Sequence, residues 1–285
     1  MEFNEEQRRA IEFKDGNCCV IACAGSGKTA VLVNRIENLI NRYNVEPSSI
    51  LTISFDNNSK GVIKNRLSNM LGHQIANLVK VNTFHGFGYG IIKDQMDKKL
   101  LTFRQKKEII TNLCLFNKVF HNTADINYGE IYSFISKKKN NLEEPDLANV
   151  DESILENSRY ILDILNREYE STSKSINDYN LSNLNKIYSL YENKKTSSGL
   201  IDFDDMLTLA CDTLNKNKEY CEMIKKRYKY ILVDEMQDVN KAQFFLLNKI
   251  QSNNLFVVGD PFQNIYGFRN DRKRYQRCRI SYIFY

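Results

Sequence analysis

The residues best suited to chemistry form a short loop of small side chains. The segment Ala22-Cys23-Ala24-Gly25-Ser26-Gly27-Lys28-Thr29 fits the phosphate-loop pattern GxxxxGK followed by Ser or Thr, except that Ala22 stands at the first glycine. Small residues let backbone N–H groups wrap a triphosphate, and the start of a following helix adds a positive dipole end. Lys28 would reach the β- and γ-phosphates, and the Thr29 hydroxyl would bind Mg²⁺. The alternative is a chance turn of glycine and serine.

A pair of carboxylates, Asp234 and Glu235, directly follows the apolar run 230–233. Asp234 is suited to hold Mg²⁺ in its outer coordination shell, and Glu235 to orient and deprotonate an attacking water. For the dipeptide alone, a solvated acidic strand end is the simpler interpretation. The continuation through Gln237 and Asp238 favours the catalytic one.

A parallel sheet is needed to bring the loop and the carboxylates together. Strand-like apolar runs occur at 18–23, 49–55, 79–84, 230–235 and 255–260. The last two runs end in a carboxylate, at the edge where strands of a parallel sheet present their active sites. The first run leads into apolar residues at helical spacing, namely Val31, Leu32, Ile36, Leu39 and Ile40. The sequence therefore predicts an α/β fold.

The α/β pattern is interrupted by long polar helical stretches that are rich in lysine and asparagine. We interpret residues 91–198 as an inserted all-helical subdomain. Residues 1–90 and 199–269 then form one discontinuous domain, and residues 270–285 form a divergent basic and apolar tail. The run Lys137–Lys139, followed by two asparagines, is interpreted as a solvated loop.

The net charge of +5 on 285 residues suggests a nucleic-acid partner until the charge is located. Between Arg269 and Arg279 there are six basic residues and one acidic residue, so the other 34 basic and 34 acidic residues cancel. The isoelectric point is therefore no evidence of a basic groove across the body. Residues 1–13 lack an apolar signal region, and the chain has no run of about 18 apolar residues. We expect a soluble cytoplasmic protein without a membrane partner.

The seven cysteines form no CxxC pair. Their odd number and spacing disfavour both a structural zinc site and a disulfide framework. We expect reduced cysteines that are mostly buried.

Several blocks of the sequence resemble, in order, the motifs of UvrD/Rep-type superfamily 1 DNA helicases. The block 233–238 is similar to the DEFQD motif and the block 258–269 to the GDxxQSIYxFR motif. Further blocks resemble the Q-motif (Phe3–Gln7), the TFTN block (Leu51–Asn57), the TFHSF block (Asn82–Phe87) and the DFDDL block (Leu200–Met206). The resemblance implies a P-loop, RecA-like sheet domain that uses ATP and Mg²⁺ and binds single-stranded DNA.

The resemblance also implies roles for single residues. Gln7 would read the adenine edge, and Arg35 would pack on the adenine. Gln263 would sense the γ-phosphate, and Tyr266 with Phe268 would couple it to DNA. The expected catalytic residues are thus Glu235, Gln263 and Lys28, the expected nucleotide contacts are residues 22–29 with Gln7, Arg35 and Gln263, and the expected Mg²⁺ contacts are Thr29 and Asp234.

Aromatic side chains are the expected DNA contacts, because a base stacked on a ring contributes about 1 to 3 kcal/mol with little dependence on sequence. The candidates are Phe55, Tyr266 and Phe268, with Asn57 and His85 as polar neighbours. Taken singly, each aromatic residue is better explained as part of the core. Only the resemblance favours the DNA role.

Five positions depart from the family pattern, and none of them removes a phosphate or Mg²⁺ ligand. Asn58 replaces a usual lysine and so loses a positive charge near the expected DNA path. The other departures are Asp56 for a hydroxyl residue, Gly86 for serine, Met236 for an aromatic residue and Asn264 for serine.

The resemblance stops after Arg269. Residues 270–285 are either a basic nucleic-acid arm or the product of a truncated or frame-shifted gene, which leaves the apolar end 280–285 without an obvious partner. We favour the second interpretation because the pattern is lost abruptly inside a core motif. The family's second motor domain, whose arginine fingers contribute about 10³ to 10⁵ in turnover, would then be missing.

We therefore expect the ATP-binding part of an ATP-dependent DNA helicase, a P-loop ATPase by family. By itself it would bind ATP and Mg²⁺ weakly, hydrolyse ATP little or not at all, and not unwind DNA. The alternative is a non-motor, ATP-dependent binding module that is completed in trans by a protein supplying the second motor domain. A small-molecule kinase is disfavoured because the chain shows no lid-like arginine pair, and because Gln237, Asp238 and Gln243 would have no role.

Overall fold

The computed structural model describes residues 2–23, 25–93, 96, 98–116, 126–142, 181–260 and 280–284. The chain divides into two compact units, Met1–Gly90 with Lys216–Tyr285 and Ile91–Asn215. Helices alternate with parallel strands in the first unit, so the predicted α/β class is confirmed.

The first unit is built on a parallel sheet. In the described part of the chain this sheet has six strands in the order β3-β2-β6-β7-β1-β8, and each neighbouring pair is parallel. A parallel sheet is covered on both faces, so its strands carry apolar side chains on both faces. Accordingly, β2 and β6 are buried at every residue. The strands are β1 Asn17–Ile21, β2 Ile50–Ser54, β3 Lys80–Thr83, β6 Tyr230–Val233, β7 Leu255–Gly259 and β8 Ile280–Phe284.

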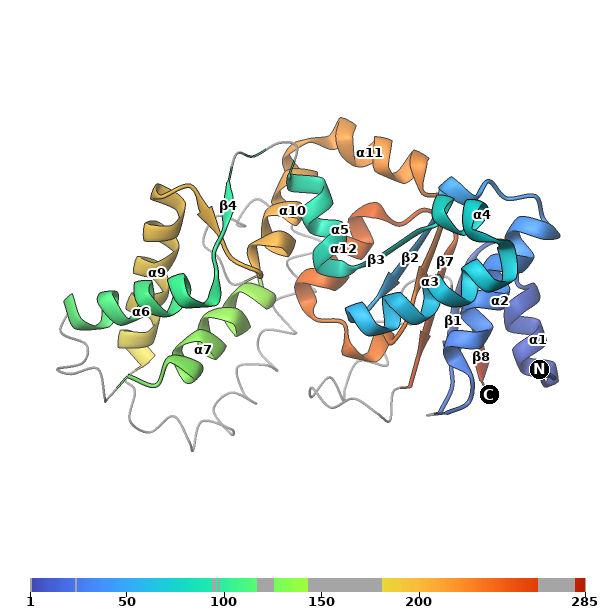
Figure 1. Cartoon of the computed structure of the whole chain (residues 1–285), viewed down its shortest axis with the longest axis horizontal. Coiled ribbons are helices and arrows are strands. Elements are labelled where there is room, and N and C mark those ends of the chain that lie inside the picture. The colour runs from blue at the N-terminus through green and yellow to red at the C-terminus, as the bar shows by residue number, and fades with distance from the viewer. Residues whose placement is uncertain are drawn as a thin grey trace. The chain divides into compact units, whose positions relative to one another are not determined.

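Helices cover both faces of the sheet because the connections run in opposite directions along it. The connections through α2 and α3 run from β1 towards β3, whereas the connection through α12 runs from β6 back towards β1. Right-handed crossovers then place α12 on the opposite face from α2 and α3, and Figure 1 shows α2 and α3 in front of the strands. The helices are α1 Glu5–Glu12, α2 Lys28–Asn41, α3 Asn57–Leu71, α4 His73–Leu78, α5 Phe84–Ile92, α11 Lys218–Arg227 and α12 Lys241–Ile250, with 3-10 turns η1 Pro47–Ser49 and η5 Met236–Asp238.

The apolar segment 280–284 pairs with strand β1. β8 lies along β1 in parallel register, with Asn17 opposite Ile280 and Ile21 opposite Phe284. Ile283 is 6% exposed and belongs to the core on the α2 face. β1 would otherwise present unpaired backbone groups to solvent, and a run of β-branched and aromatic residues suits that edge. The expectation of no obvious partner is therefore wrong for residues 280–284.

The second unit has a separate core that contains Ile110, Ile131, Ile135, Ile187 and Tyr191. Two short parallel strands differ from the all-helical expectation, and the chain returns to the first unit at Lys216 rather than near residue 199. The elements of this unit are β4 Lys99–Leu100, α6 Phe103–Phe116, α7 Tyr128–Asn140, α9 Leu181–Ser197, β5 Leu200–Ile201 and α10 Asp205–Lys216.

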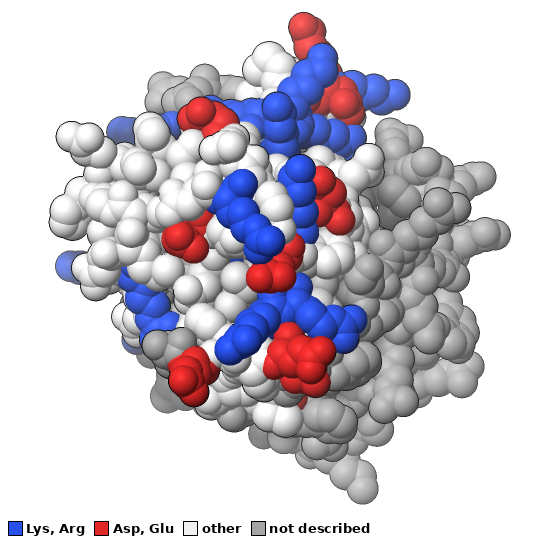
Figure 2. All heavy atoms as spheres, turned by 90° about the vertical axis from the view of Figure 1, so that its right-hand side faces the viewer, with Lys and Arg blue, Asp and Glu red and all other residues white. Residues whose placement is uncertain are grey.

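Charged side chains of both signs share the surface. Figure 2 shows one face, on which basic and acidic side chains lie next to one another. Five of the six described cysteines are buried thiols, and Cys23 in the phosphate loop is exposed. Among the described residues, no helix is both long enough and apolar enough to cross a membrane.

Candidate active site

The carboxyl edge of the parallel sheet gathers the candidate site residues. The neighbouring strands β6, β7 and β1 end, in that order, at Asp234, at Asp260 and at the phosphate loop. Since parallel strands end on the same edge, residues far apart in the sequence come together there. The Asp234 backbone N–H donates to the Ile53 carbonyl at 3.0 Å, and the Thr29 hydroxyl donates to Asp234 across a sequence separation of 205.

Two glycines give the phosphate loop its shape. Gly25 has a φ of 72° and Gly27 a φ of 85°, a left-handed conformation that a residue with a Cβ adopts only with strain. Gly27 is also the N-cap of α2, and no side chain caps the first amides of this helix. Uncapped N–H groups at a helix start are ready to bind a phosphate. Ala24 lies outside the described residues.

Other loop residues anchor this turn. The Ser26 hydroxyl donates to the Cys23 carbonyl at 2.7 Å. Ala22 donates its N–H to the Gly259 carbonyl at 3.1 Å and so continues the pairing of β1 with β7. Ala22 has no positive φ, which is why alanine can stand where the pattern has its first glycine.

The predicted ATP and Mg²⁺ residues meet in two pairs. The Lys28 ammonium group lies 3.5 Å from a Glu235 carboxylate oxygen, and the lysine is 7% exposed. The Thr29 hydroxyl donates to Asp234 Oδ2 at 3.3 Å. Burial, together with the neighbouring charge of Glu235, raises the pKa of Asp234 to about 6. A cation, a hydroxyl and two carboxylates thus converge beside the phosphate loop.

Gln237 is a site residue whose role the sequence did not reveal. Its Nε2 donates to Glu235 Oε2 at 2.8 Å, and its Oε1 accepts the Asp260 N–H at 3.0 Å. A Cβ on Gly259 would lie 2.7 Å from that Oε1, so the glycine leaves room for the contact. Gln237 therefore fixes the Glu235 carboxylate and ties it to the end of β7.

Gln7 lies beside the phosphate loop. Its Nε2 donates to the Ser26 carbonyl at 2.8 Å. The same side chain accepts the Asn4 N–H at 3.0 Å and completes a reciprocal cap of α1. The hydrogen bond from Gln7 to Ser26, which are 19 residues apart in the sequence, thus holds the start of α1 against the phosphate loop. The adenine-reading role of Gln7 stays a prediction.

Arg35 is buried in α2. It is 1% exposed, and its guanidinium group stacks on Phe256 at 4.4 Å and lies 5.3 Å from the ring centre of Phe13. Its Nη2 donates to the Lys14 carbonyl at 3.2 Å. Among the described residues, its Nε and Nη1 have no hydrogen-bond partner. The adenine-packing role of Arg35 stays a prediction.

The DNA-facing candidates that the structure describes follow β2 and β3 on the same edge of the sheet. Phe55 is 37% exposed, and Asn57 is exposed at the start of α3. His85 is half-buried, and burial lowers its pKa to about 4, so its ring is neutral at pH 7. Gln263, Tyr266 and Phe268 lie outside the described residues.

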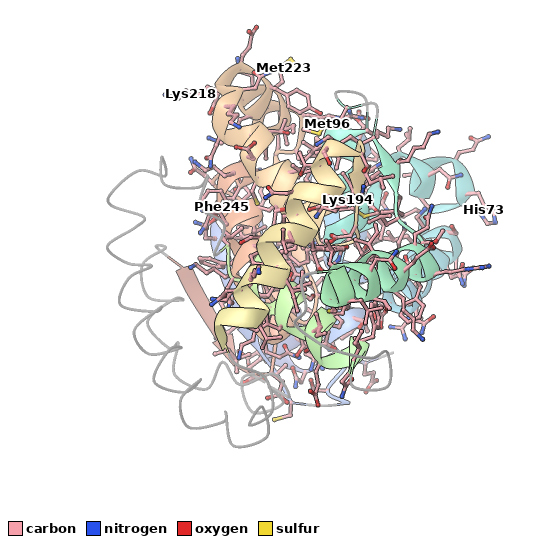
Figure 3. All side chains as sticks on the ribbon, turned by 90° about the vertical axis from the view of Figure 1, so that its left-hand side faces the viewer. His73, Met96, Lys194, Lys218, Met223 and Phe245 are labelled. Carbon is pink, nitrogen blue, oxygen red and sulfur yellow. The ribbon has the colours of Figure 1, made fainter. Side chains whose placement is uncertain are left out.

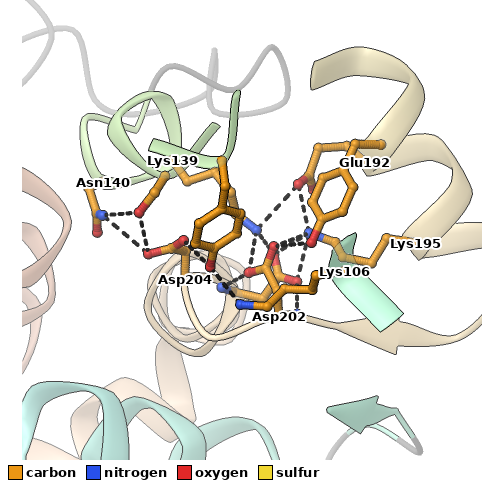
Figure 4. A network of polar contacts seen from close by, with 11 residues as sticks. Lys106, Lys139, Asn140, Glu192, Lys195, Asp202 and Asp204 are labelled. Atoms are coloured by element: carbon orange, nitrogen blue, oxygen red, sulfur yellow. Dashed lines mark hydrogen bonds and ion pairs between the residues drawn. The ribbon is translucent and has the colours of Figure 1, made fainter. Parts of the chain in front are cut away.

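A buried ionic network marks the DFDDL-like block in the second unit (Figure 4). Lys139 and Lys195 both bind Asp202 and Asp205, and Lys139 has no exposed surface. Lys139 belongs to the last turn of α7, so the solvated-loop interpretation of the lysine run was wrong for this residue. Figure 4 also shows Asp204, whose Oδ1 accepts hydrogen bonds from Ser136 at 3.1 Å and Asn140 at 3.2 Å.

The carboxylates of this network could be mistaken for a metal site. Ligand oxygens of Glu192, Asp202 and Asp205 lie within 4.8 Å of one another. The ammonium groups of Lys139 and Lys195 already contact all three carboxylates. Two lysine ammonium groups therefore stand where a metal ion would bind the carboxylates, and the network joins α7, α9 and the start of α10.

Known proteins match this arrangement. A family model for the UvrD/REP helicase N-terminal domain matches residues 3–276. The chain belongs to this family. The match covers β1, β2, β3, β6 and β7 of the sheet and the segment between β3 and β6, and it confirms the family that the ordered motifs predicted.

Curated relatives agree with the family assignment. The chain is 32% identical to the ATP-dependent DNA helicase Rep of Buchnera aphidicola subsp. Baizongia pistaciae, over 94% of this chain and 37% of the relative. It is 30% identical to the ATP-dependent DNA helicase PcrA of Staphylococcus aureus, over 93% of this chain and 34% of the relative. The chain thus spans about a third of the length of the curated relatives it matches.

Proposed function

We propose that this chain forms the ATP-binding part of an ATP-dependent translocase or helicase that moves on single-stranded DNA. The observation that carries the proposal is the meeting of Lys28 with Glu235, and of Thr29 with Asp234, beside uncapped helix amides. The proposal is supported by the family and by relatives that are named ATP-dependent DNA helicases.

The residues present fit a magnesium-bound triphosphate. Mg²⁺ prefers oxygen ligands, and a hydroxyl and a carboxylate oxygen stand 3.3 Å apart at Thr29 and Asp234. We assign the direct contact to Thr29 and the outer shell to Asp234. Mg²⁺, when bound, would neutralise charge on the β- and γ-phosphates. The loop amides and Lys28 would hold the same phosphates.

Lys28 has two competing anionic partners. Lys28 contacts Glu235 at 3.5 Å, and a bound triphosphate would offer it a higher negative charge. Transfer of Lys28 to the phosphates leaves Glu235 free to take a proton from the attacking water. Gln237 keeps the Glu235 carboxylate in place throughout, since its amide donates to Oε2 at 2.8 Å.

DNA binding is proposed on the neighbouring strands of the same edge. Phe55 follows β2 and His85 follows β3, whereas the phosphate loop follows β1. A base can stack on the exposed ring of Phe55, and the neutral ring of His85 can add a polar contact that carries no charge. The same edge of the sheet would thus bind the nucleotide beside β1 and β6, and the DNA strand beside β2 and β3.

The test compares nucleotide binding by Lys28→Ala and Glu235→Gln. Lys28→Ala is expected to lose most of the affinity for MgATP. Glu235→Gln is expected to bind MgATP about fivefold more tightly, because it removes a competing ion pair of about 1 kcal/mol, while turnover falls by at least about 10²-fold. Fluorescent-nucleotide titration and phosphate release measure the two quantities. Glu219→Gln, an exposed carboxylate on α11, is the matched control.

Turnover by these 285 residues alone is expected to be slow. Family members complete the site with arginine fingers from a second motor domain, which contribute about 10³ to 10⁵. Fast, DNA-stimulated hydrolysis that Glu235→Gln abolishes would overturn this expectation. Stimulation only after a second protein is added would favour a module completed in trans. Unchanged MgATP affinity in Lys28→Ala would overturn the ATP site itself.

A further inference from the structure

Positive charge is concentrated in one part of a body that is neutral in total. Residues 57–93 contain five basic residues and no aspartate or glutamate. They form α3, α4, β3 and α5, at the β3 end of the sheet. A neutral sum over the whole body therefore conceals a local excess of positive charge.

Three of these basic residues lie close together on the outer flank of the sheet. Lys60 and Lys64 are one turn apart on α3, and Lys80 begins the edge strand β3, which α3 packs against. Burial, and then the charges of Lys64 and Lys80, lowers the pKa of Lys60. Among the described residues no carboxylate forms an ion pair with any of the three. Unpaired lysines that repel one another attract an anion with several charges.

Lys60 is held in a defined position. Its Nζ donates to Asn82 Oδ1 at 3.1 Å, and the same oxygen accepts the Thr83 N–H at 3.1 Å. A Cβ at position 86 would lie only 2.5 Å from that oxygen. Gly86 therefore makes room for Asn82, and Asn82 directs Lys60. Position 86 has glycine instead of the family's serine, and position 58 has asparagine instead of the usual lysine. Both departures accompany an ordered lysine at position 60, two residues after Asn58.

We propose that Lys60, Lys64 and Lys80 form a lysine track that binds successive backbone phosphates of the single strand whose bases stack on Phe55. The inference rests on the proposed function and names the surface that the strand follows. Phe55 precedes the Asp56 N-cap of α3, and Lys60 donates its backbone N–H to the Asp56 carbonyl at 3.1 Å. The lysines lead away from this ring along the flank of the sheet, since Lys60 contacts Asn82 near the carboxyl end of β3 and Lys80 pairs with Leu51 at its amino end. An exposed ring followed by a row of ammonium groups suits a nucleic-acid strand, because it offers both stacking and charge.

The test is the salt dependence of single-stranded DNA binding. Fluorescence anisotropy with a labelled polythymidine strand gives the dissociation constant of the full 285-residue chain at several salt concentrations. Each phosphate contact on a single strand contributes about 0.7 to the slope of log affinity against log salt, so the triple variant Lys60→Ala, Lys64→Ala, Lys80→Ala should lose about 2 from the slope. Phe55→Ala should weaken binding and leave the slope unchanged.

The matched control is Lys218→Ala, an exposed lysine at the start of α11 (Figure 3). Asn82→Ala frees Lys60 without removing its charge, so it should weaken binding less than Lys60→Ala does and keep the slope. Retained MgATP affinity shows that each variant is folded. A triple variant with the wild-type slope would overturn the track. Wild-type chain that binds MgATP but no strand would refute the DNA proposal and leave the ATP site intact.

Discussion

Asp234 and Glu235 are adjacent in sequence but have different surroundings. Asp234 is 2% exposed and accepts a hydrogen bond from the Thr29 hydroxyl, whereas Glu235 faces a lysine and the Gln237 amide. Glu235 also has a φ of 52°, a left-handed conformation that is costly for a residue with a side chain. The kink turns Glu235 away from the strand direction, so the two carboxylates can serve separate tasks.

Magnesium-dependent nucleotide binding should decline in mild acid. Since the pKa of Asp234 is raised to about 6, the carboxyl group takes up a proton as the pH falls through that value, and the proton competes with Mg²⁺. MgATP affinity should be constant above about pH 7 and fall by up to about tenfold per unit below about pH 6. Titration with and without Mg²⁺ measures this. Asp234→Asn should abolish the pH dependence, and persistence of the dependence in that variant would refute the assignment.

The same raised pKa makes the contribution of Asp234 to folding stability larger in acid, whereas MgATP binding is weaker there. The folded protein retains a proton on Asp234 that the unfolded chain has already lost. This group therefore stabilises the fold most below about pH 4, and its contribution is lost as the pH rises to about 6. The ionised carboxylate, which forms above about pH 6, is the form that the proposed Mg²⁺ contact needs.

At the scale of elements, the strands of the sheet position the candidate site residues, which lie in the loops directly after the strands. β1, β6 and β7 are short and almost wholly buried. The functional side chains follow them directly, in loops that need unusual backbone conformations at Gly25, Gly27 and Glu235. A buried strand thus ends where a loop with left-handed residues begins, and Gln237 joins two of these loops through its hydrogen bonds with Glu235 and Asp260.

The contribution of β8 to the sheet can be tested by mutation. Ile283→Ala should lower the free energy of unfolding of the first unit by about 2 to 4 kcal/mol, because it empties space in the core on the α2 face. Urea denaturation followed by circular dichroism measures the change. Val62→Ala, on an exposed part of α3, is the control and should change stability by less than about 0.5 kcal/mol. Equal stability of the two variants would show that β8 does not pair with β1.

At the scale of the whole molecule, two units carry different kinds of interior. The first has an apolar core around its sheet, and the second adds the ionic network of Lys139, Lys195, Asp202 and Asp205 to its apolar core. Burial alone would raise the pKa of Asp202, but Lys139 and Lys195 outweigh burial and hold it well below its usual range. The stabilisation from Asp202 is therefore present above about pH 4 and is lost as the pH falls further.

Removing one lysine of the network should destabilise the second unit selectively. Lys139→Met leaves Asp202 and Asp205 short of a partner, and breaking a buried ion pair in this way costs about 3 to 5 kcal/mol. Hydrogen exchange resolved by segment should show faster exchange in residues 91–215, while MgATP affinity, a property of the first unit, is kept. Lys137→Met, an exposed neighbour on α7, is the control. Equal exchange in both variants would contradict a structural role for the network.

The sequence by itself determined the fold class, the family and the phosphate loop with its carboxylates. Apolar strand runs and glycine spacing are local properties, and six ordered motifs leave little room for another fold. Burial and contact between distant side chains are not local, and there sequence reasoning was wrong. It placed Lys139 in a solvated loop, because a charged residue looks the same in sequence whether its neighbours are water or a buried partner.

Only the tertiary structure decided which charges meet. It joined Gln237 to Glu235 and Asp260, gave the apolar end 280–284 a partner in β1, and aligned Lys60 with Lys80. The physical reason is the parallel topology, which places the ends of strands from distant parts of the chain along one edge and leaves β3 as an open flank.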